Sequence, residues 1–315
     1  SVSPGTVVHL VVSSGPCPPA TVTVPDVTGQ PLSSAEGVLT ESGLVSGQVT
    51  EECSDTVPAG SVVGQDPAGG ASVSPGTVVH LVVSSGPCPV IFADPNLESA
   101  VRQTLGVGPG PITKADMLRL TTLSASQRNI TSLAGLEHAT NLEVLYLQEN
   151  QLTDLEALSG LTNLRTLVLN NNALTSEALS ALSGLANLES LTLESNLITA
   201  VDSLSSLAKL TLLDLKGNQI EAVNALAGLS ELKTLILWSN RLTDEDLQAL
   251  STLTGLTYLD LRDNLLTNVS ALLSLTQLQT LHLTGNELDA TSCESVIPQL
   301  TARGVSVSCE DCCSP

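Results

Sequence analysis

One pattern of leucines and asparagines recurs through most of this chain and restricts its fold more than any other feature. From Leu120 the sequence repeats Leu-x-x-Leu-x-Leu-x-x-Asn-x-Leu/Ile, with asparagines at positions 150, 172, 196, 218, 240, 264 and 286. These asparagines are 22 or 24 residues apart. A unit this short cannot bury its own apolar face, so neighbouring units must stack and share one core. Arg128 takes the asparagine position one period earlier, as expected of an atypical terminal repeat.

Each repeat predicts a short strand followed by a return turn. Leucine pairs such as Leu145 and Leu147 alternate with other residues and therefore point inward from a strand, and each Asn can bridge successive turns through backbone hydrogen bonds. The second half of each repeat, for example 152–163, resembles the convex-side turns of bacterial 22-residue leucine-rich repeats. Longer second halves at 174–187 and 242–255 allow an added helical turn. We therefore predict an α/β leucine-rich repeat solenoid at 120–299, with eight parallel strands spanning on the order of 34 Å on the concave face.

The two ends of the repeats require caps, because the first and last core layers would otherwise be exposed. Residues 90–119 predict an N-terminal cap, with an amphipathic helix that begins after Asp94 and a second short helix or turn at 112–120. This segment resembles the caps that precede internalin-type repeats. At the other end, a helix at 293–300 and a last strand at 305–307 lead into a cap and Cys-rich tail at 300–315.

The first ninety residues carry a second, longer repeat. Residues 1–18, SVSPGTVVHLVVSSGPCP, recur unchanged at 72–89, so the period is 71 residues, and the tail of one module (1–18) precedes a whole one (19–89). Alternating residues predict strands at 21–27, 44–52, 61–66 and 77–84, and a short helix that ends at Gly43 follows the first of them. The module is expected to be a small α+β domain.

The motifs of this module together resemble a PASTA domain. They are Val24-Pro-Asp-Val-Thr-Gly29, Ser54-Asp-Thr-Val-Pro-Ala-Gly60, Gln65-Asp-Pro-Ala-Gly69 and the segment from Val73 to Ser84. PASTA domains occur in tandem on the outer face of bacterial cells, where some bind peptidoglycan fragments and others only act as spacers. The resemblance implies an extracellular or bacterial cell-surface protein. Of the two roles we favour the spacer, because a fold does not by itself define a function.

The seven cysteines lie mostly beside Pro, Ser and acidic residues, at the edges of the repeats. We expect them to form disulfides, which implies an oxidising location. In the N-terminal part, Cys53–Cys88 within the module is the simplest pairing. Cys17–Cys53, which would join neighbouring modules, is the alternative.

In the C-terminal cap, Cys293–Cys309 would join the last helix to the end of the last strand. Cys312 and Cys313 then remain free, bonded to each other or bonded to another chain. Zinc is the alternative to disulfides, since Cys309-Glu-Asp-Cys312-Cys313 contains a Cys-x-x-Cys. A second pair at ligand spacing and a nearby His are missing from the sequence, so we expect no metal.

Composition excludes several classes of function. The net charge is −21, from 11 Lys and Arg against 32 Asp and Glu, so the surface repels nucleic acid and anionic lipid. No apolar run approaches the roughly 20 residues of a membrane helix, and a secretion-signal layout is missing from the first residues. The sequence also lacks the motifs of phosphate-binding loops, zinc proteases and Gly-x-Ser-x-Gly hydrolases. We predict a protein without enzymatic activity, cofactor or membrane insertion by this chain.

Binding residues are expected on the concave face, at the strand positions that alternate with the inward leucines. Three of the four aromatic residues of the chain fall there. Exposed Trp, Tyr and Arg dominate the hot spots of protein interfaces, although Tyr and Trp also suit a half-exposed strand face for structural reasons alone. We predict that the partner contacts Tyr146, Lys216, Ile236, Trp238, Tyr258, Asp260, Arg262 and His282.

Two functions remain open at this stage. In the first, a PASTA stalk presents the leucine-rich repeat surface to a protein or glycan, with peptidoglycan as a further ligand of the PASTA module. In the second, the chain is a structural subunit of an extracellular fibre or surface layer, with the half-module or Cys17, Cys312 or Cys313 at the junctions. A third reading makes the chain the sensor part of a larger receptor kinase. We favour the binding protein.

Overall fold

The structure, a computed structural model, describes residues 3–5, 7, 9–10, 15 and 20–313. The chain divides into two compact units, Ser1–Cys88 and Pro89–Pro315, which are described here one at a time. The half-module expected at 1–18 falls largely on residues outside this description, and Cys17 lies outside it altogether.

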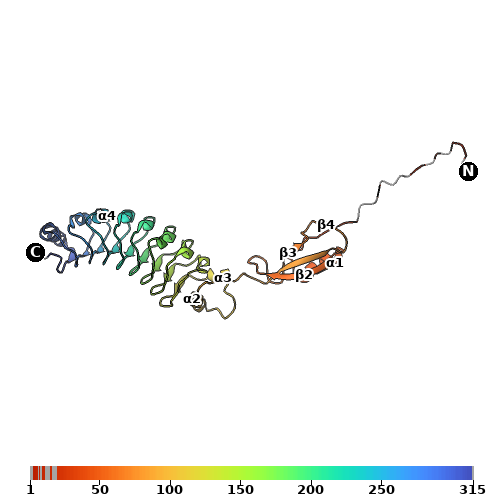
Figure 1. Cartoon of the computed structure of the whole chain (residues 1–315), viewed down its shortest axis with the longest axis horizontal. Helices are drawn as coiled ribbons and strands as arrows, with labels where there is room; N and C mark the ends of the chain where they lie inside the picture. Colours follow the sequence, from red (N-terminus) through yellow and green to blue (C-terminus); the bar gives the residue numbers. More distant parts are fainter. Residues whose placement is uncertain (1–2, 6, 8, 11–14, 16–19, 314–315) are drawn as a thin grey trace. The chain divides into compact units, whose positions relative to one another are not determined.

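The N-terminal unit is a small α+β domain (Figure 1). Strands β2 and β3 both pair with β5, β2 in parallel and β3 in antiparallel orientation, and β1 pairs separately with β4. Helix α1 contributes the fully buried Ala35 and Leu39 to a small aliphatic core that also contains Val27 and Val62. The elements are β1 (Val22–Thr23), α1 (Leu32–Glu41), β2 (Val45–Glu52), β3 (Val62–Asp66), β4 (Ser72–Val73) and β5 (Val78–Ser84).

The first strand of this unit is shorter than the sequence predicts, because its backbone leaves the ladder after Thr23. The amide of Val24 donates to Ala71 O, and the amide of Val27 donates to the side-chain oxygen of Gln65 at 2.8 Å. Cys53 and Cys88 are joined by a disulfide, with 4.9 Å between their Cα atoms. It joins the segments that follow the parallel neighbours β2 and β5, so the cross-link lies within one module.

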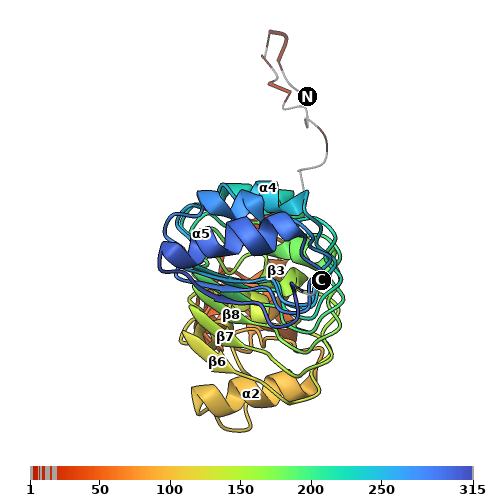
Figure 2. The same ribbon diagram turned by 90° about the vertical axis from the view of Figure 1, so that its left-hand side faces the viewer.

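The second unit is a solenoid with one parallel sheet of nine strands in chain order, and β6, β7 and β8 lie one above another in Figure 2. Each strand is three residues long. The last one follows the C-terminal helix and pairs with β13, which is why the sheet has one strand more than the eight expected. The strands are β6 (Thr122–Ser124), β7 (Val144–Tyr146), β8 (Thr166–Val168), β9 (Ser190–Thr192), β10 (Leu212–Asp214), β11 (Thr234–Ile236), β12 (Tyr258–Asp260), β13 (Thr280–His282) and β14 (Ser306–Ser308).

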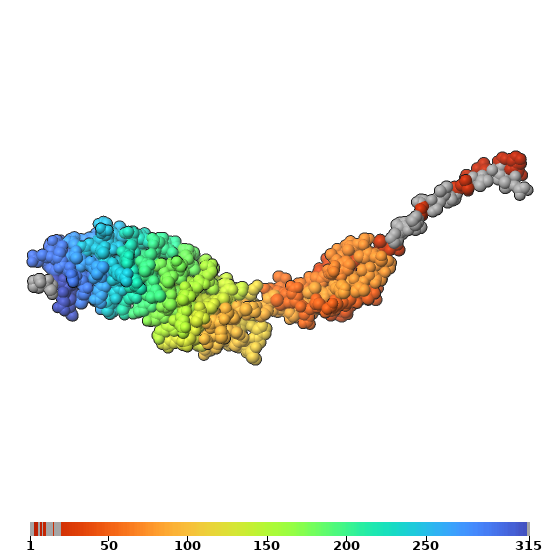
Figure 3. Space-filling view, viewed as in Figure 1, coloured from red at the N-terminus to blue at the C-terminus, as the bar shows by residue number. Residues whose placement is uncertain are grey.

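The convex side carries one short helix per repeat. The two 24-residue repeats have the longer turns that the sequence predicts, and the second of them forms the α-helix α4 (Asp246–Leu250). The others are the 3-10 helices η1 (Leu136–His138), η2 (Glu156–Leu158), η3 (Ala178–Leu182), η4 (Asp202–Leu204), η5 (Asn224–Gly228) and η6 (Ser270–Ser274). In the space-filling view this unit is continuous from the first repeat to the last (Figure 3).

The solenoid is held together by stacked leucines and by a ladder of asparagines. The leucines of the repeats form one core that runs through the whole unit, nearly all of them fully buried. The ladder asparagines are also largely buried, and each bridges two turns. The side chain of Asn196 accepts from the amide of Leu174 at 3.1 Å and donates to the carbonyls of Leu169 and Leu193 at 3.1 and 3.0 Å. The backbone groups that the turns leave unpaired are thereby satisfied without water.

Helical segments lie at both ends of the core. Helix α2 (Pro95–Leu105) packs beside β6 and begins at Asp94, whose side chain accepts from the amides of Asn96 and Leu97. Helix α3 (Lys114–Met117) follows, with a capping box at its start. At the other end the π-helical turn η7 (Ser292–Val296) continues into α5 (Ile297–Ala302) before β14.

The disulfides of the C-terminal cap differ from the expected Cys293–Cys309 bond. Cys293 is bonded to Cys313, and Cys309 is bonded to Cys312. The chain turns back after Cys309 through Asp311, which has a φ of 61°, and this turn brings Cys312 to Cys309 and Cys313 to the helix. Cys312 and Cys313 are thus paired with Cys309 and Cys293 of the same chain, which differs from the three alternatives that the sequence left open for them: free, bonded to each other or bonded to another chain.

Candidate binding face

Strands β10 to β13 place four repeats in register on the concave face. Asp214, Ile236, Asp260 and His282 are direct neighbours across these strands. Two residues after the ends of β10, β11 and β12 come Lys216, Trp238 and Arg262, in that order. We call the concave patch the set formed by Glu194, Asp214, Lys216, Ile236, Trp238, Tyr258, Asp260, Arg262, Asp263 and His282.

Trp238 is the centre of the concave patch, and charged side chains hold its indole ring. The Lys216 Nζ atom lies 4.4 Å from the ring centroid, and the Arg262 Cζ atom lies 3.9 Å from it. The indole N–H donates to a carboxylate oxygen of Asp263 at 2.6 Å. Cation–π contacts of this kind stabilise by about 0.5–2 kcal/mol each. The indole is therefore fixed in place before any partner arrives.

The two cations are themselves fixed by carboxylates. Arg262 donates from Nε and Nη2 to both oxygens of Asp260, with the shortest distance at 2.5 Å, and these hydrogen bonds raise the pKa of the guanidinium above its usual range. Lys216 Nζ lies 2.6 Å from an oxygen of Glu194. Asp260 is only 1% exposed. Although we predicted it as a contact residue, in the structure it supports Arg262 from beneath.

The carboxylates of Glu194 and Asp260 form salt bridges with Lys216 and Arg262, whereas that of Asp214 is hydrogen-bonded by the backbone. Its carboxylate accepts from the backbone amide of Lys216 at 3.0 Å. Burial raises its pKa above the usual value, against that hydrogen bond, and the nearby carboxylates of Glu194 and Asp260 raise it further. The folded chain therefore holds a half-buried negative charge in the middle of the concave face.

We expect Asp214→Asn to increase stability at pH 7. A carboxyl whose pKa is raised by folding binds its proton more tightly in the folded state, so stability is lost as the pH rises from about 3.8 through the folded pKa. The substitution removes that cost above this window and changes little below it. Urea titrations at pH 7 and pH 3.5 measure both effects, with Asp154→Asn on the exposed convex side as the control of equal charge. Equal stabilisation by both variants at pH 7 would show that only net charge matters.

The remaining predicted residues occupy two places. Tyr258 packs against His282 with ring centroids 5.4 Å apart, and the Nδ1 atom of His282 lies 2.6 Å from the hydroxyl of Ser308 on β14. These residues extend the concave patch toward the C-terminal cap. Tyr146 lies on β7, four strands from β11, which is roughly 19 Å at 4.8 Å per strand. It therefore belongs to a separate part of the same face.

Sequence reasoning did not select four residues that shape this site: Glu194, Asp214, Asp263 and Ser308. Asp263 precedes the ladder residue Asn264 and has a φ of 49°, which turns its side chain toward the neighbouring repeat. Each ladder asparagine from Asn150 to Asn286 has a residue with a left-handed φ immediately before it. The signal in the sequence was a polar residue immediately before a ladder asparagine, in the repeat that follows Trp238.

No helix in the described part of the chain is long and apolar enough to cross a membrane.

Comparison with known families agrees with both units. The PASTA domain family matches residues 22–85. Leucine-rich repeat families match residues 118–160, 162–220 and 230–288. The chain is therefore a leucine-rich repeat protein with a PASTA domain in front of the repeats.

Solved structures identify the type of repeat. Internalin C2 from Listeria monocytogenes is 35% identical, with a TM-score of 0.64, over 71% of this chain and 97% of that one. Another internalin from the same species is 27% identical, with a TM-score of 0.58, over 70% of each chain. The chain belongs to the internalin-like leucine-rich repeat family.

Curated relatives match over a much shorter length. A probable serine/threonine-protein kinase from Corynebacterium efficiens is 44% identical over 84 residues, which is 26% of this chain and 12% of that protein. One from Clostridium acetobutylicum is 38% identical over 86 residues, or 27% of this chain and 13% of that protein. The chain thus spans about an eighth of the length of these relatives, and the matched length is close to that of the PASTA unit.

Proposed function

We propose that this chain is a non-enzymatic binding protein of the bacterial surface, and that the concave patch around Trp238 binds a protein partner. The observation that carries the proposal is the arrangement of Trp238 between Lys216 and Arg262. Preorganised aromatic and Arg side chains on a rigid sheet lose little conformational entropy on binding. The internalin-like fold supports a binding role, since stacked repeats form extended concave surfaces.

A protein partner fits the concave patch better than a glycan does. Lys216 and Arg262 both lie over the indole ring of Trp238, so a sugar that stacks on the ring must first displace a cation. A protein side chain can instead contact the ring edge, Ile236 and Tyr258 while the cations stay in place. A protein partner can therefore bind without moving Lys216 or Arg262 from the ring of Trp238.

The charge of the patch favours a basic partner. Four carboxylates, on Glu194, Asp214, Asp260 and Asp263, surround only two cations, and the whole chain carries a net charge of −21. Complementary charge speeds association and excludes wrong partners. A Lys or Arg of the partner would neutralise Asp214, and binding would weaken as salt is added.

The PASTA unit has a spacer role in this proposal. Its small core and its Cys53–Cys88 disulfide make it a self-contained module. Tandem copies would extend a binding tip from the cell surface without contributing to recognition. The alternative is that the PASTA unit binds peptidoglycan. Retention of the chain by insoluble cell wall in a pull-down would detect this binding.

Substitution of Trp238 tests the proposed site. Surface proteins retained by the immobilised full chain are purified and titrated against wild-type chain and variants by calorimetry. We expect Trp238→Ala to weaken binding by at least about 30-fold, as hot-spot residues cost about 2 kcal/mol or more.

Lys216→Ala should weaken the same binding, because Lys216 contacts the ring, whereas Lys209→Ala is the matched control. Lys209 also makes one hydrogen bond, to Asn187, but lies before β10 and away from the concave patch. Unchanged affinity in Trp238→Ala, with the melting temperature intact, would rule out the site.

A further inference from the structure

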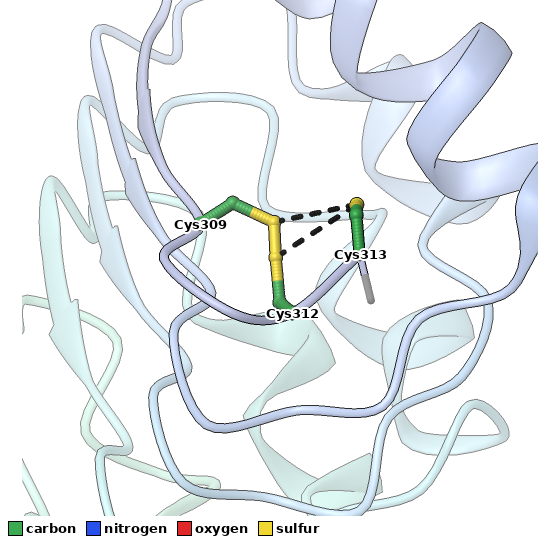
Figure 4. Close-up of side chains that lie close together, drawn as sticks. All are labelled: Cys309, Cys312 and Cys313. Atoms are coloured by element: carbon green, nitrogen blue, oxygen red, sulfur yellow. Dashed lines mark hydrogen bonds between the residues drawn. A yellow bond between two sulfur atoms is a disulfide. The ribbon is translucent and has the colours of Figure 1, made fainter. Parts of the chain in front are cut away.

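The C-terminal cap brings four cysteines together from two distant segments. Cys293 lies in η7, whereas Cys309, Cys312 and Cys313 follow β14. The bonds are Cys293–Cys313 and Cys309–Cys312. Figure 4 shows Cys313 facing the other disulfide, with its sulfur 3.7 Å from that of Cys309 and 4.0 Å from that of Cys312. The two disulfides are therefore in contact with each other.

The backbone holds this cluster independently of the sulfur atoms. Leu288 donates its amide to the carbonyl of Cys312, and Cys312 is only 1% exposed within the solenoid core. Asp311 adopts a left-handed φ of 61°, which closes the short turn between Cys309 and Cys312. The amide of Cys293 donates to Asp289 O. Both segments thus keep their positions through main-chain contacts.

Two separations between the sulfurs have the length that a tetrahedral metal requires, because the Cys313 sulfur lies 3.7 Å from that of Cys309 and 4.0 Å from that of Cys312. A zinc ion bound to four thiolates at about 2.3 Å separates neighbouring sulfurs by about 3.8 Å. The sulfurs of Cys309, Cys312 and Cys313 all lie within 4.8 Å of one another, and that of Cys293 is bonded to Cys313. A fourth sulfur, missing from the local Cys-x-x-Cys-Cys sequence, is that of Cys293 in η7.

We propose that the reduced form of this cap binds one zinc ion through Cys293, Cys309, Cys312 and Cys313. Two equivalents of a dithiol reduce the two disulfides to four thiols and are themselves oxidised to disulfides. The four thiols then release four protons as they bind Zn²⁺, giving a tetrathiolate site. Disulfides and zinc are alternative cross-links of the same four residues, so the last leucine layer stays covered in either redox state.

Cobalt binding tests this proposal on the full chain. A variant with Cys17, Cys53 and Cys88 replaced by Ser keeps only the four cap cysteines. After anaerobic reduction we expect it to bind one Co²⁺ per chain with the visible absorption of tetrahedral thiolate coordination, and Zn²⁺ should displace the Co²⁺. The oxidised chain should give no such absorption, because its sulfurs are bonded to each other.

Removal of single ligands separates a four-cysteine site from the local motif. Cys293→Ser in the same background should shift the Co²⁺ spectrum and weaken binding by at least about tenfold. Circular dichroism and the melting temperature with and without Zn²⁺ report whether the reduced cap is folded, and zinc should raise that temperature. A reduced, folded chain that binds no Co²⁺, or a Cys293→Ser variant that binds it unchanged, would overturn the proposal.

Discussion

Replacement of Asn196 by Ala should lower the free energy of unfolding by about 3 kcal/mol. Asn196 is 5% exposed. Without it, the amide of Leu174 and the carbonyls of Leu169 and Leu193 lose their partner in a place that water does not reach. Buried backbone groups left unpaired cost about 1–3 kcal/mol each, although neighbouring losses are not additive. Urea unfolding followed by circular dichroism measures the change.

Two further substitutions show whether this loss is specific to an asparagine of the ladder or would follow the removal of an asparagine elsewhere. Asn163 is exposed and makes a single hydrogen bond, to the carbonyl of Thr140, so Asn163→Ala should cost less than about 1 kcal/mol. Asn196→Asp keeps the acceptor but turns a carboxylate toward carbonyl groups, and it should destabilise at least as much as Ala. A ladder that contributed little would give similar, small losses in all three variants.

Asp94→Ala should destabilise the N-terminal cap by about 2–3 kcal/mol. One oxygen of Asp94 caps α2 through the amides of Asn96 and Leu97. The other accepts from the amide and the hydroxyl of Thr131, at 2.7 and 3.0 Å. One side chain therefore starts the cap helix and attaches it to the first repeat. Amide hydrogen exchange should show loss of protection that begins in α2 and β6, whereas Asp94→Asn, which can still cap the helix, should lose less.

The same residue predicts a dependence on pH. Burial raises the pKa of Asp94, but its hydrogen bonds from Thr131, Asn96 and Leu97 outweigh burial and lower it below its usual value. Its stabilising effect is then complete above about pH 3.8 and is lost as the pH falls through the folded pKa. Wild-type chain should therefore lose more stability between pH 5 and pH 2 than Asp94→Asn does, as measured by urea titration across that range.

Most of the fold could be predicted from the sequence, because the same pattern of leucines and asparagines recurs in one repeat after another. The positions of Leu145, Leu147 and their equivalents define the strands, and the asparagine spacing defines which repeats are longer. The first strand of the N-terminal unit was overpredicted because alternation continues through Val27, while Gln65, distant in sequence, takes the Val27 amide. The ninth strand was missed as a member of the sheet, because β14 lacks the leucine pattern and pairs with β13 only after the cap helix has turned the chain back.

The candidate site was only partly predictable. The sequence indicates which residues share the concave face, since that follows from alternation and repeat length. It does not indicate that Trp238 contacts Lys216 and Arg262, or that Arg262 covers Asp260, because these depend on side-chain conformations across neighbouring repeats. The predicted cysteine pairing of the cap was wrong for a similar reason, because the left-handed turn at Asp311 decides which sulfur reaches Cys293.

Site-specific photo-crosslinking tests most directly whether the concave patch binds the partner. A photoreactive phenylalanine analogue is placed in the full chain either at Thr234, half-buried on β11 beside the concave patch, or at Glu231, exposed before that strand. We predict that the purified partner crosslinks from position 234 and not from position 231, and that Trp238→Ala abolishes the crosslink. Crosslinking from position 231 alone, or from position 234 with equal yield in the Trp238→Ala chain, would contradict the proposed binding site.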